Sequence, residues 1–247
     1  MEAARDFLIN LLAEGTWFLL GVLATPLVYL VSRIIPARQL WNLNAPGETI
    51  ICVSASHRGD TGEYIRPATG IGQLRAVAVA LGSLDVAYRR IRFKNILMSD
   101  EALGRRVEND LILFGGPKNN PITRIVLERV QAKYGVEQDE RRICWHTSLG
   151  PAECVPIVES RKVKKDIGLV IRTRNPLSRR KSTVCVFSGG HTFGTVAAVD
   201  FFIDHYGAWW RLWKRLPRTL IAVVECDVLD DYHVNTRLVR EQLFWRT

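Results

Sequence analysis

Residues 184–198 read VCVFSGGHTFGTVAA, and the other segments of the chain can be placed around this one. A short apolar run with β-branched residues stops at Gly189 and Gly190, and a helical pattern with small residues follows at once. This order is typical of a parallel strand whose carboxyl end leads into the N-terminus of a helix. Unpaired N–H groups and the positive end of the helix dipole can bind phosphate or carboxylate there. The alternative is a tight turn whose glycines serve only packing.

Another junction of the same kind lies earlier in the chain and begins with the apolar run Leu111–Phe114. In chain order, the turn after Leu111–Phe114 is the first glycine turn and the turn at Gly189 and Gly190 is the second. It continues as GGPKNNP over residues 115–121 and then as a helical pattern over residues 122–134. Asparagine suits the capping position of a helix and proline suits its first turn, which favours a helix start at Asn120 and Pro121. Since both junctions have the same order of elements, we expect them to line one cleft.

Further apolar runs predict the remaining strands. The longer runs lie at residues 49–54, 93–98, 167–172 and 219–226, and shorter ones lie at residues 143–146 and 155–158. A helical pattern covers residues 73–84. Residues 56–64 contain too much glycine and charge for an element and predict a loop. The tail from Tyr232 predicts either a final edge strand or a short helix.

Strands that are continuous apolar runs and alternate with helices indicate an α/β domain with a largely parallel sheet flanked by helices. Ligands of such sheets bind outside the carboxyl ends of the strands, where the strand order reverses. Both glycine junctions and the loop at residues 56–64 should therefore lie on one edge of the sheet.

The N-terminal segment predicts one transmembrane helix before this domain. Residues 15–32 contain no charge and are long enough to span a bilayer. Trp17 and Trp41 suit the two membrane interfaces, and Arg33 and Arg38 at the C-terminal end place the bulk of the chain in the cytoplasm. We therefore expect a single-pass protein of the cell inner membrane, with its membrane contact at residues 15–35. Residues 1–41 would form the anchor, and residues 42–247 the cytoplasmic domain.

Two alternatives to a membrane anchor are a buried core helix and a cleaved signal peptide. The signal peptide fits less well, because Glu2, Asp6 and Glu14 outnumber Arg5 ahead of the apolar run. No A-x-A cleavage site follows that run.

The chain of 247 residues carries a net charge of +9, which indicates an anionic partner such as nucleic acid, a nucleotide or acidic lipid. Its five cysteines are scattered and include no C-x-x-C pair, so a reducing compartment is favoured over a disulfide framework. Cys144, His146 and Cys154 are too few for a zinc site, and we expect no metal. The chain has no G-x-x-x-x-G-K-[ST] motif, and its glycine spacing departs from G-x-G-x-x-G.

The residues expected to bind a phosphate-bearing ligand come from the two glycine turns. They are Gly115, Gly116, Lys118, Asn119, Asn120, Ser188, Gly189, Gly190, His191, Thr192, Gly194 and Thr195. The two asparagines have an alternative role in turning the chain and capping the helix. His191 and His57 are the candidates for an acid or base, because an unperturbed histidine titrates near neutral pH.

Two basic stretches carry the excess of positive charge. Residues 161–181 contain nine lysines or arginines, which predict a solvated loop and edge strand or an anion-facing rim. Residues 208–216 combine Trp209, Trp210 and Trp213 with cations, a composition that suits a segment lying on an anionic leaflet. The alternative buries these tryptophans under the sheet or in a subunit contact.

The two strand–Gly-Gly–helix junctions together resemble the nucleotide-binding Rossmann-like domains of the SLOG type, which occur beside transmembrane segments in bacterial nucleotide signalling and phage defence. The resemblance covers residues 49–226 in layout and the two glycine turns in motif. Gly194 matches the further glycine of that family's signature, whereas its following methionine is missing. The resemblance implies a Rossmann-like sheet and a nucleotide-like ligand.

Three functions follow from these patterns. The leading hypothesis is a membrane-anchored cytoplasmic domain that binds a nucleotide-like ligand and signals through its anchor or as a homo-oligomer. The second is a hydrolase or glycosidase that acts on a nucleotide, with His191 or His57 as acid or base. The third is a structural or lipid-binding membrane protein without a small ligand.

Overall fold

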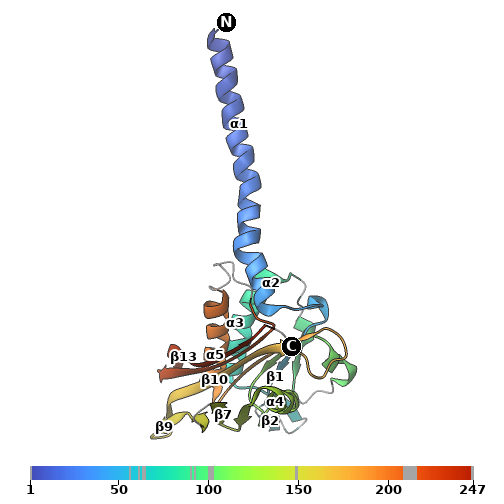
Figure 1. Cartoon of the computed structure of the whole chain (residues 1–247), viewed down its shortest axis with the longest axis vertical. Helices are drawn as coiled ribbons and strands as arrows, with labels where there is room; N and C mark the ends of the chain where they lie inside the picture. Colours follow the sequence, from blue (N-terminus) through green and yellow to red (C-terminus); the bar gives the residue numbers. More distant parts are fainter. Residues whose placement is uncertain are drawn as a thin grey trace.

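The structure, a computed structural model, describes residues 2–55, 57–60, 62, 65–89, 91, 93–99, 103–147, 150–207 and 216–245. A long helix leads into an α/β domain, and Figure 1 shows α1 projecting away from that domain. The domain has three layers. Helices α2, α3 and α5 cover one face of the central sheet. Helix α4 and the small three-stranded sheet at residues 136–154 cover the other face.

The helices of the structure have the following bounds. The α-helices are α1 (Glu2–Tyr29), α2 (Ile35–Trp41), α3 (Ile71–Ala87), α4 (Pro121–Tyr134) and α5 (Thr192–Phe201). Two π-helical segments are η1 (Leu30–Ile34) and η5 (Phe202–Tyr206). Three short 3-10 helices are η2 (Pro46–Glu48), η3 (Phe93–Asn95) and η4 (Gly104–Glu108).

The strands of the structure form three sheets. The central sheet contains β1 (Ile50–Val53), β4 (Ile96–Met98), β5 (Leu111–Phe114), β9 (Ile157–Glu159), β10 (Lys162–Arg174), β11 (Thr183–Gly189), β12 (Thr219–Leu229) and β13 (Tyr232–Phe244). A hairpin contains β2 (His57–Asp60) and β3 (Ile65–Ala68). The third sheet, called the small sheet below, contains β6 (Val136–Asp139), β7 (Arg142–Thr147) and β8 (Gly150–Cys154).

The central sheet is mixed, which corrects the expectation of a largely parallel one. Its order is β13-β12-β10-β11-β5-β1-β4. Strands β4, β1, β5 and β11 are parallel, whereas β10, β12 and β13 pair antiparallel with their neighbours and β9 pairs antiparallel with β10. A parallel return needs a crossover of a dozen or more residues, and the link from β10 to β11 is shorter than that. Asp230 and Asp231 join β12 to β13 with φ values of 48° and 60°, as a two-residue hairpin turn requires.

Two other predicted elements need correction. Residues 56–64 are not a plain loop, because His57–Asp60 forms β2 and pairs antiparallel with β3. Residues 93–98 divide into the 3-10 helix Phe93–Asn95 and the short strand Ile96–Met98. The tail forms the edge strand β13, which settles between the two alternatives for it.

The N-terminal helix runs without interruption from α1 through η1 to α2. Pro36 explains the π-helical segment, since it lacks the N–H group that the carbonyl of Ser32 would otherwise accept. Trp17 is 74% exposed, and the apolar side chains described between residues 18 and 30 are exposed as well, so the buried-core alternative is wrong. This helix is long and apolar enough to cross a membrane, with a mean hydropathy of 2.0.

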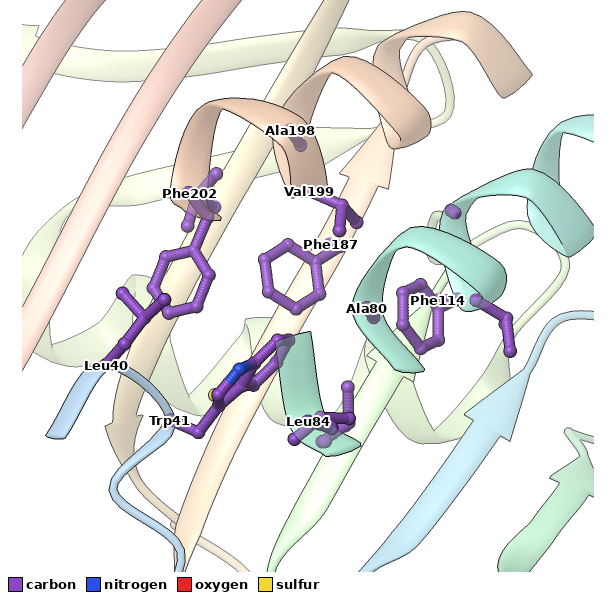
Figure 2. Close-up of a cluster of buried hydrophobic side chains, with 14 of the residues drawn as sticks. Leu40, Trp41, Ala80, Leu84, Phe114, Phe187, Ala198, Val199 and Phe202 are labelled. Carbon is purple, nitrogen blue, oxygen red and sulfur yellow. The ribbon is translucent and has the colours of Figure 1, made fainter. Parts of the chain in front are cut away.

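Trp41 lies in the core of the domain and not at a membrane interface, which corrects the sequence-based prediction. Its side chain is fully buried and contacts α3, β11 and η5. Figure 2 shows it beside Phe187 and Phe202, with ring centroids 5.8 and 5.3 Å away. The helix that begins as an anchor candidate therefore ends as part of the domain core.

Candidate functional site

A cleft of 330 Å³ lies where the carboxyl ends of β1, β5 and β11 meet. The chain passes from β1 to β4 on one side of β1 and to β5 on the other, so the strand order reverses at this point. Eight residues of the two predicted turns line the cleft: Gly116, Lys118, Asn119, Gly189, Gly190, His191, Thr192 and Thr195. The structure thus brings both glycine turns into one cleft, as their shared order of elements predicts.

The N-terminus of α5 already holds a carboxylate of the protein itself. Asp166 lies on the central strand β10 and is fully buried. Its carboxylate accepts hydrogen bonds from the N–H groups of His191 (3.0 Å) and Gly194 (2.6 Å). A third bond comes from the N–H group of Ile167. Of the first turn of α5, these bonds leave the N–H groups of Thr192 and Phe193 for a ligand. The sequence predicts that the whole turn binds phosphate, but Asp166 already occupies half of these four N–H groups.

Two glycines of the second turn serve close packing. A Cβ atom at Gly194 would lie 1.9 Å from the carbonyl oxygen of Ile167, and one at Gly189 would lie 2.5 Å from the nitrogen of Thr195. Helix α5 can approach β10 and β11 only because these side chains are missing. The packing alternative holds for this pair, although Gly189 also lines the cleft, as does Gly190.

Ser188 faces away from the cleft and is held by the small sheet. Its buried hydroxyl donates to Oε1 of Gln138 on β6, and Nε2 of Gln138 donates to the carbonyl of Gly189. This clamp attaches the β6–β7 hairpin to the second glycine turn. The tip of that hairpin supplies Glu140 and Arg141 to the cleft wall.

The first glycine turn divides into capping and cleft-lining residues. Asn120 is fully buried, and its Oδ1 accepts from the N–H groups of Ile122 and Thr123 at the start of α4. The capping alternative is thus confirmed for Asn120. Lys118 is exposed and lies 3.2 Å from the carboxylate of Glu140 across the cleft, while Asn119 is exposed beside it.

The N-terminus of a second helix, α3, points at the same cleft. The helix is capped by Gly70, which brings no side chain, and its third residue Gln73 lines the cleft. A Cβ atom at Gly72 would lie 2.3 Å from Cβ of Thr192, so the first turns of α3 and α5 are in contact. Two helix dipoles therefore direct their positive ends into one volume.

Three buried polar atoms on the cleft residues lack a hydrogen-bond partner among the residues that the structure describes. They are Oγ of Ser54, Oε1 of Gln73 and Nε2 of His191. Burial and the nearby Arg141 lower the pKa of His191, which favours a neutral imidazole. Larger hollows of 580 Å³ beside β7 and 430 Å³ beside α2 have no such atom in their walls. The unpartnered groups distinguish the cleft at the sheet edge from every wider hollow described.

Sequence reasoning missed Ser54, Gln73, Asp166 and Arg141. Ser54 directly follows a predicted parallel strand, and Gln73 is a polar residue at the start of an apolar helix, so the carboxyl-edge rule could have found both. Asp166 is the only acid among nine cations at residues 161–181. That basic stretch also contains all of β10, which is a central strand of the sheet and not an edge strand.

Two predictions concern side chains that lie outside the described residues, namely the acid or base role of His57 and the membrane contact of the tryptophans at residues 209–213. The backbone of His57 lies in β2, but its side chain is outside the described residues, as are Trp209, Trp210 and Trp213. Within the described part of the chain, no cluster of three metal-ligating side chains occurs.

Comparison of the chain with protein-family models gives no match. A search of curated proteins gives none either. The case for a function therefore rests on the geometry of the cleft and on the N-terminal helix.

Replacing Asp166 by asparagine should remove a pH dependence from the stability of the domain. Burial raises the pKa of Asp166 from 3.8 to about 6, against the opposing effect of its three N–H donors. Between these values the folded state keeps a proton that the unfolded state has lost, so stability falls as the pH rises through this window. A shift of this size corresponds to about 3 kcal/mol between pH 4 and pH 7.

This difference is measured by chemical unfolding of the full chain in detergent at both pH values, with wild type, Asp166→Asn and the exposed control Asp85→Asn. The control should follow wild type at both. Equal pH dependence in wild type and Asp166→Asn would contradict the assignment.

Proposed function

We propose that the chain is a membrane-anchored protein whose cytoplasmic α/β domain binds a nucleotide-like, phosphate-bearing ligand in the cleft at the sheet edge. The observation that carries this proposal is the convergence of two helix N-termini on a cleft with three unpartnered buried polar atoms. Such atoms cost about 1–3 kcal/mol each when they stay unpaired, and a ligand that bonds them recovers this energy.

The anionic part of the ligand is supported by the groups at the mouth of the cleft. The N–H groups of Thr192 and Phe193 and the guanidinium of Arg141 are donors suited to phosphate oxygens. Asp166 places its own carboxylate at Gly194, so the phosphate lies nearer Thr192 and Arg141 than the middle of the turn. The cleft volume falls within the range of small-molecule sites.

The membrane part of the proposal is supported by the exposed apolar helix. Arg33 and Arg38 lie at its domain end, and the excess of positive charge at that end favours a cytoplasmic domain in a single-pass protein of the inner membrane. The helix ends inside the domain core, so a ligand-dependent change in the domain acts directly on the anchor or on self-association. These features extend the proposal to a signalling role.

Thermal unfolding of the full chain in detergent tests ligand binding. Mono-, di- and cyclic nucleotides are compared with inorganic phosphate and with heparin as a general polyanion. A nucleotide present at 100 times its Kd should add about 2.7 kcal/mol of stability, which raises Tm by about 5–10 °C.

Arg141→Gln should weaken this shift, whereas Arg142→Gln, on the neighbouring exposed arginine outside the cleft, should not. The proposal fails if no nucleotide and no polyanion raises Tm. A shift with heparin alone would favour a nucleic acid or an acidic surface as the partner.

An enzyme is the second candidate, and the position of His191 favours it. The imidazole lies in the cleft wall with Nε2 unpartnered and a lowered pKa, as a general base requires. Because Asp166 bonds the backbone of His191, His191→Ala leaves that cap intact. Each stabilising nucleotide is incubated with wild type or with His191→Ala and is then analysed by chromatography. Breakdown by wild type that His191→Ala abolishes shows an enzyme. Nucleotide that stays intact with wild type shows a binding domain.

A further inference from the structure

Ser54 and Gln73 face the same small volume inside the cleft. Their side chains are 1% and 7% exposed, and each carries a polar atom without a partner among the described residues. A Cβ atom placed on Gly115 would lie 2.5 Å from Oγ of Ser54 and 3.2 Å from Nε2 of Gln73. The side chain of Ser54 therefore packs where a side chain of Gly115 would lie, and the amide of Gln73 lies beside it in the cleft lining.

The backbone keeps this space open. Gly115 has a φ of +100°, a conformation that residues with a side chain rarely adopt, and its N–H group donates to the carbonyl of Phe187 on β11. The turn is thus held in a conformation that favours glycine, and the absence of a side chain at Gly115 lets Ser54 and Gln73 pack against it. Oγ of Ser54 and Oε1 of Gln73 are thus two buried polar atoms without described partners, next to a glycine that cannot be replaced without strain. We treat them as one polar subsite of the cleft.

The chemistry of the two groups differs from that of a phosphate site. Oε1 of Gln73 can only accept a hydrogen bond, and the hydroxyl of Ser54 can donate and accept. A deprotonated phosphate oxygen can only accept, so it leaves Oε1 of Gln73 unpaired. The positive ends of α3 and α5 disfavour an ammonium group as the donor. A neutral hydroxyl satisfies both side chains, because it donates to Gln73 and accepts from Ser54.

We propose that Ser54 and Gln73 bind hydroxyl groups of a sugar ring, and that the ligand is therefore a sugar phosphate or a nucleotide with its sugar hydroxyls intact. This inference rests on the proposed function, since it places the sugar at the carboxyl end of β1 and the phosphate toward Arg141 and Thr192. Nε2 of His191 lies on the same wall as a third group for the sugar or its substituent.

Calorimetric titration of the full chain in detergent tests the subsite with two matched probes. Ribose 5-phosphate carries ring hydroxyls, whereas tetrahydrofurfuryl phosphate has the same ring and phosphate without them. Ribose 5-phosphate should bind at least tenfold more tightly, because one hydrogen bond is worth about tenfold in Kd. Ser54→Ala and Gln73→Met should each weaken ribose 5-phosphate about tenfold and leave tetrahydrofurfuryl phosphate unchanged.

Ser182→Ala is the control for this titration. Ser182 is another buried serine with an unpartnered hydroxyl, but it precedes β11 at the end of that strand opposite the cleft. It should change neither affinity. The hydroxyl of Ser54 has no partner among the described residues, so Ser54→Ala should also fold as stably as wild type in urea, which separates lost binding from lost structure.

The outcomes separate this inference from the proposed function. Equal affinity for the two phosphates, or no effect of Ser54→Ala and Gln73→Met, overturns the hydroxyl subsite and leaves phosphate binding in place. Binding of free ribose as tight as that of ribose 5-phosphate supports the subsite and contradicts the phosphate-binding function. Binding of neither probe overturns both.

Discussion

Trp41→Ala is expected to lower the free energy of unfolding of the domain by about 3–5 kcal/mol. The indole is fully buried, packs edge-on against Phe187 and Phe202, and donates from Nε1 to Oγ of Ser83 at 3.0 Å. Alanine leaves a cavity between rings that come from η5 and β11, and these rigid elements cannot close it (Figure 2). A loss of this size is a large fraction of the stability of a single domain.

Chemical unfolding followed by near-ultraviolet circular dichroism, with the full chain in detergent, measures this effect. Trp17→Ala is the matched control, because Trp17 is 74% exposed on the same continuous helix. It should change the unfolding midpoint of the domain little. Similar small effects of both substitutions would contradict the burial of Trp41 and return it to a membrane interface.

Arg172→Met is expected to cost about 3–5 kcal/mol of stability, because each buried carbonyl left without its donor costs about 1–3 kcal/mol. Arg172 is 2% exposed on the central strand β10, and burial lowers its pKa. Its Nη1 donates to the carbonyls of Gln39 (2.9 Å) and Leu40 (2.6 Å), and Nη2 donates to that of Pro217. The first two are among the last carbonyls of the N-terminal helix, which have no partner within the helix. Methionine fills similar space but leaves three carbonyls without their donor.

Arg174→Met is the control for this substitution, since Arg174 is exposed two residues along the same strand. It should change the free energy of unfolding by less than about 0.5 kcal/mol. Both variants are compared by urea unfolding in detergent. Equal effects would show that the charge of β10, and not the bonds of Arg172 to the helix end, contributes the stability.

The elements nearest the cleft could be predicted because their signals are local. Strand β5 follows its apolar run residue for residue, and α4 begins where Asn120 and Pro121 indicate. The apolar run at residues 15–32 likewise indicates a helix that is long and apolar enough to span a membrane. Each of these features depends on residues within a few positions of one another, and a helix cap or a turn is decided at that range.

The direction of β10 and β12 could not be predicted, because a continuous apolar run looks the same in either direction. Both strands are buried on two faces by helices and by the small sheet, which removes the alternation that marks many antiparallel strands. The short link after β10 and the Asp230–Asp231 turn decide their direction. Trp41 shows the same limit, since an aromatic residue at a helix end suits an interface and a core equally well.

What the sequence by itself determined is the pair of glycine turns, the strands that lead into them and the apolar N-terminal helix. Only the tertiary structure decided what the second turn holds, because Asp166 reaches it from a strand more than twenty residues earlier in the chain. The tertiary structure also decided which polar side chains line the inner wall of the cleft. Ser54 and Gln73 become unpartnered only when β1, α3 and β5 meet, since burial and the loss of water partners are properties of packed elements.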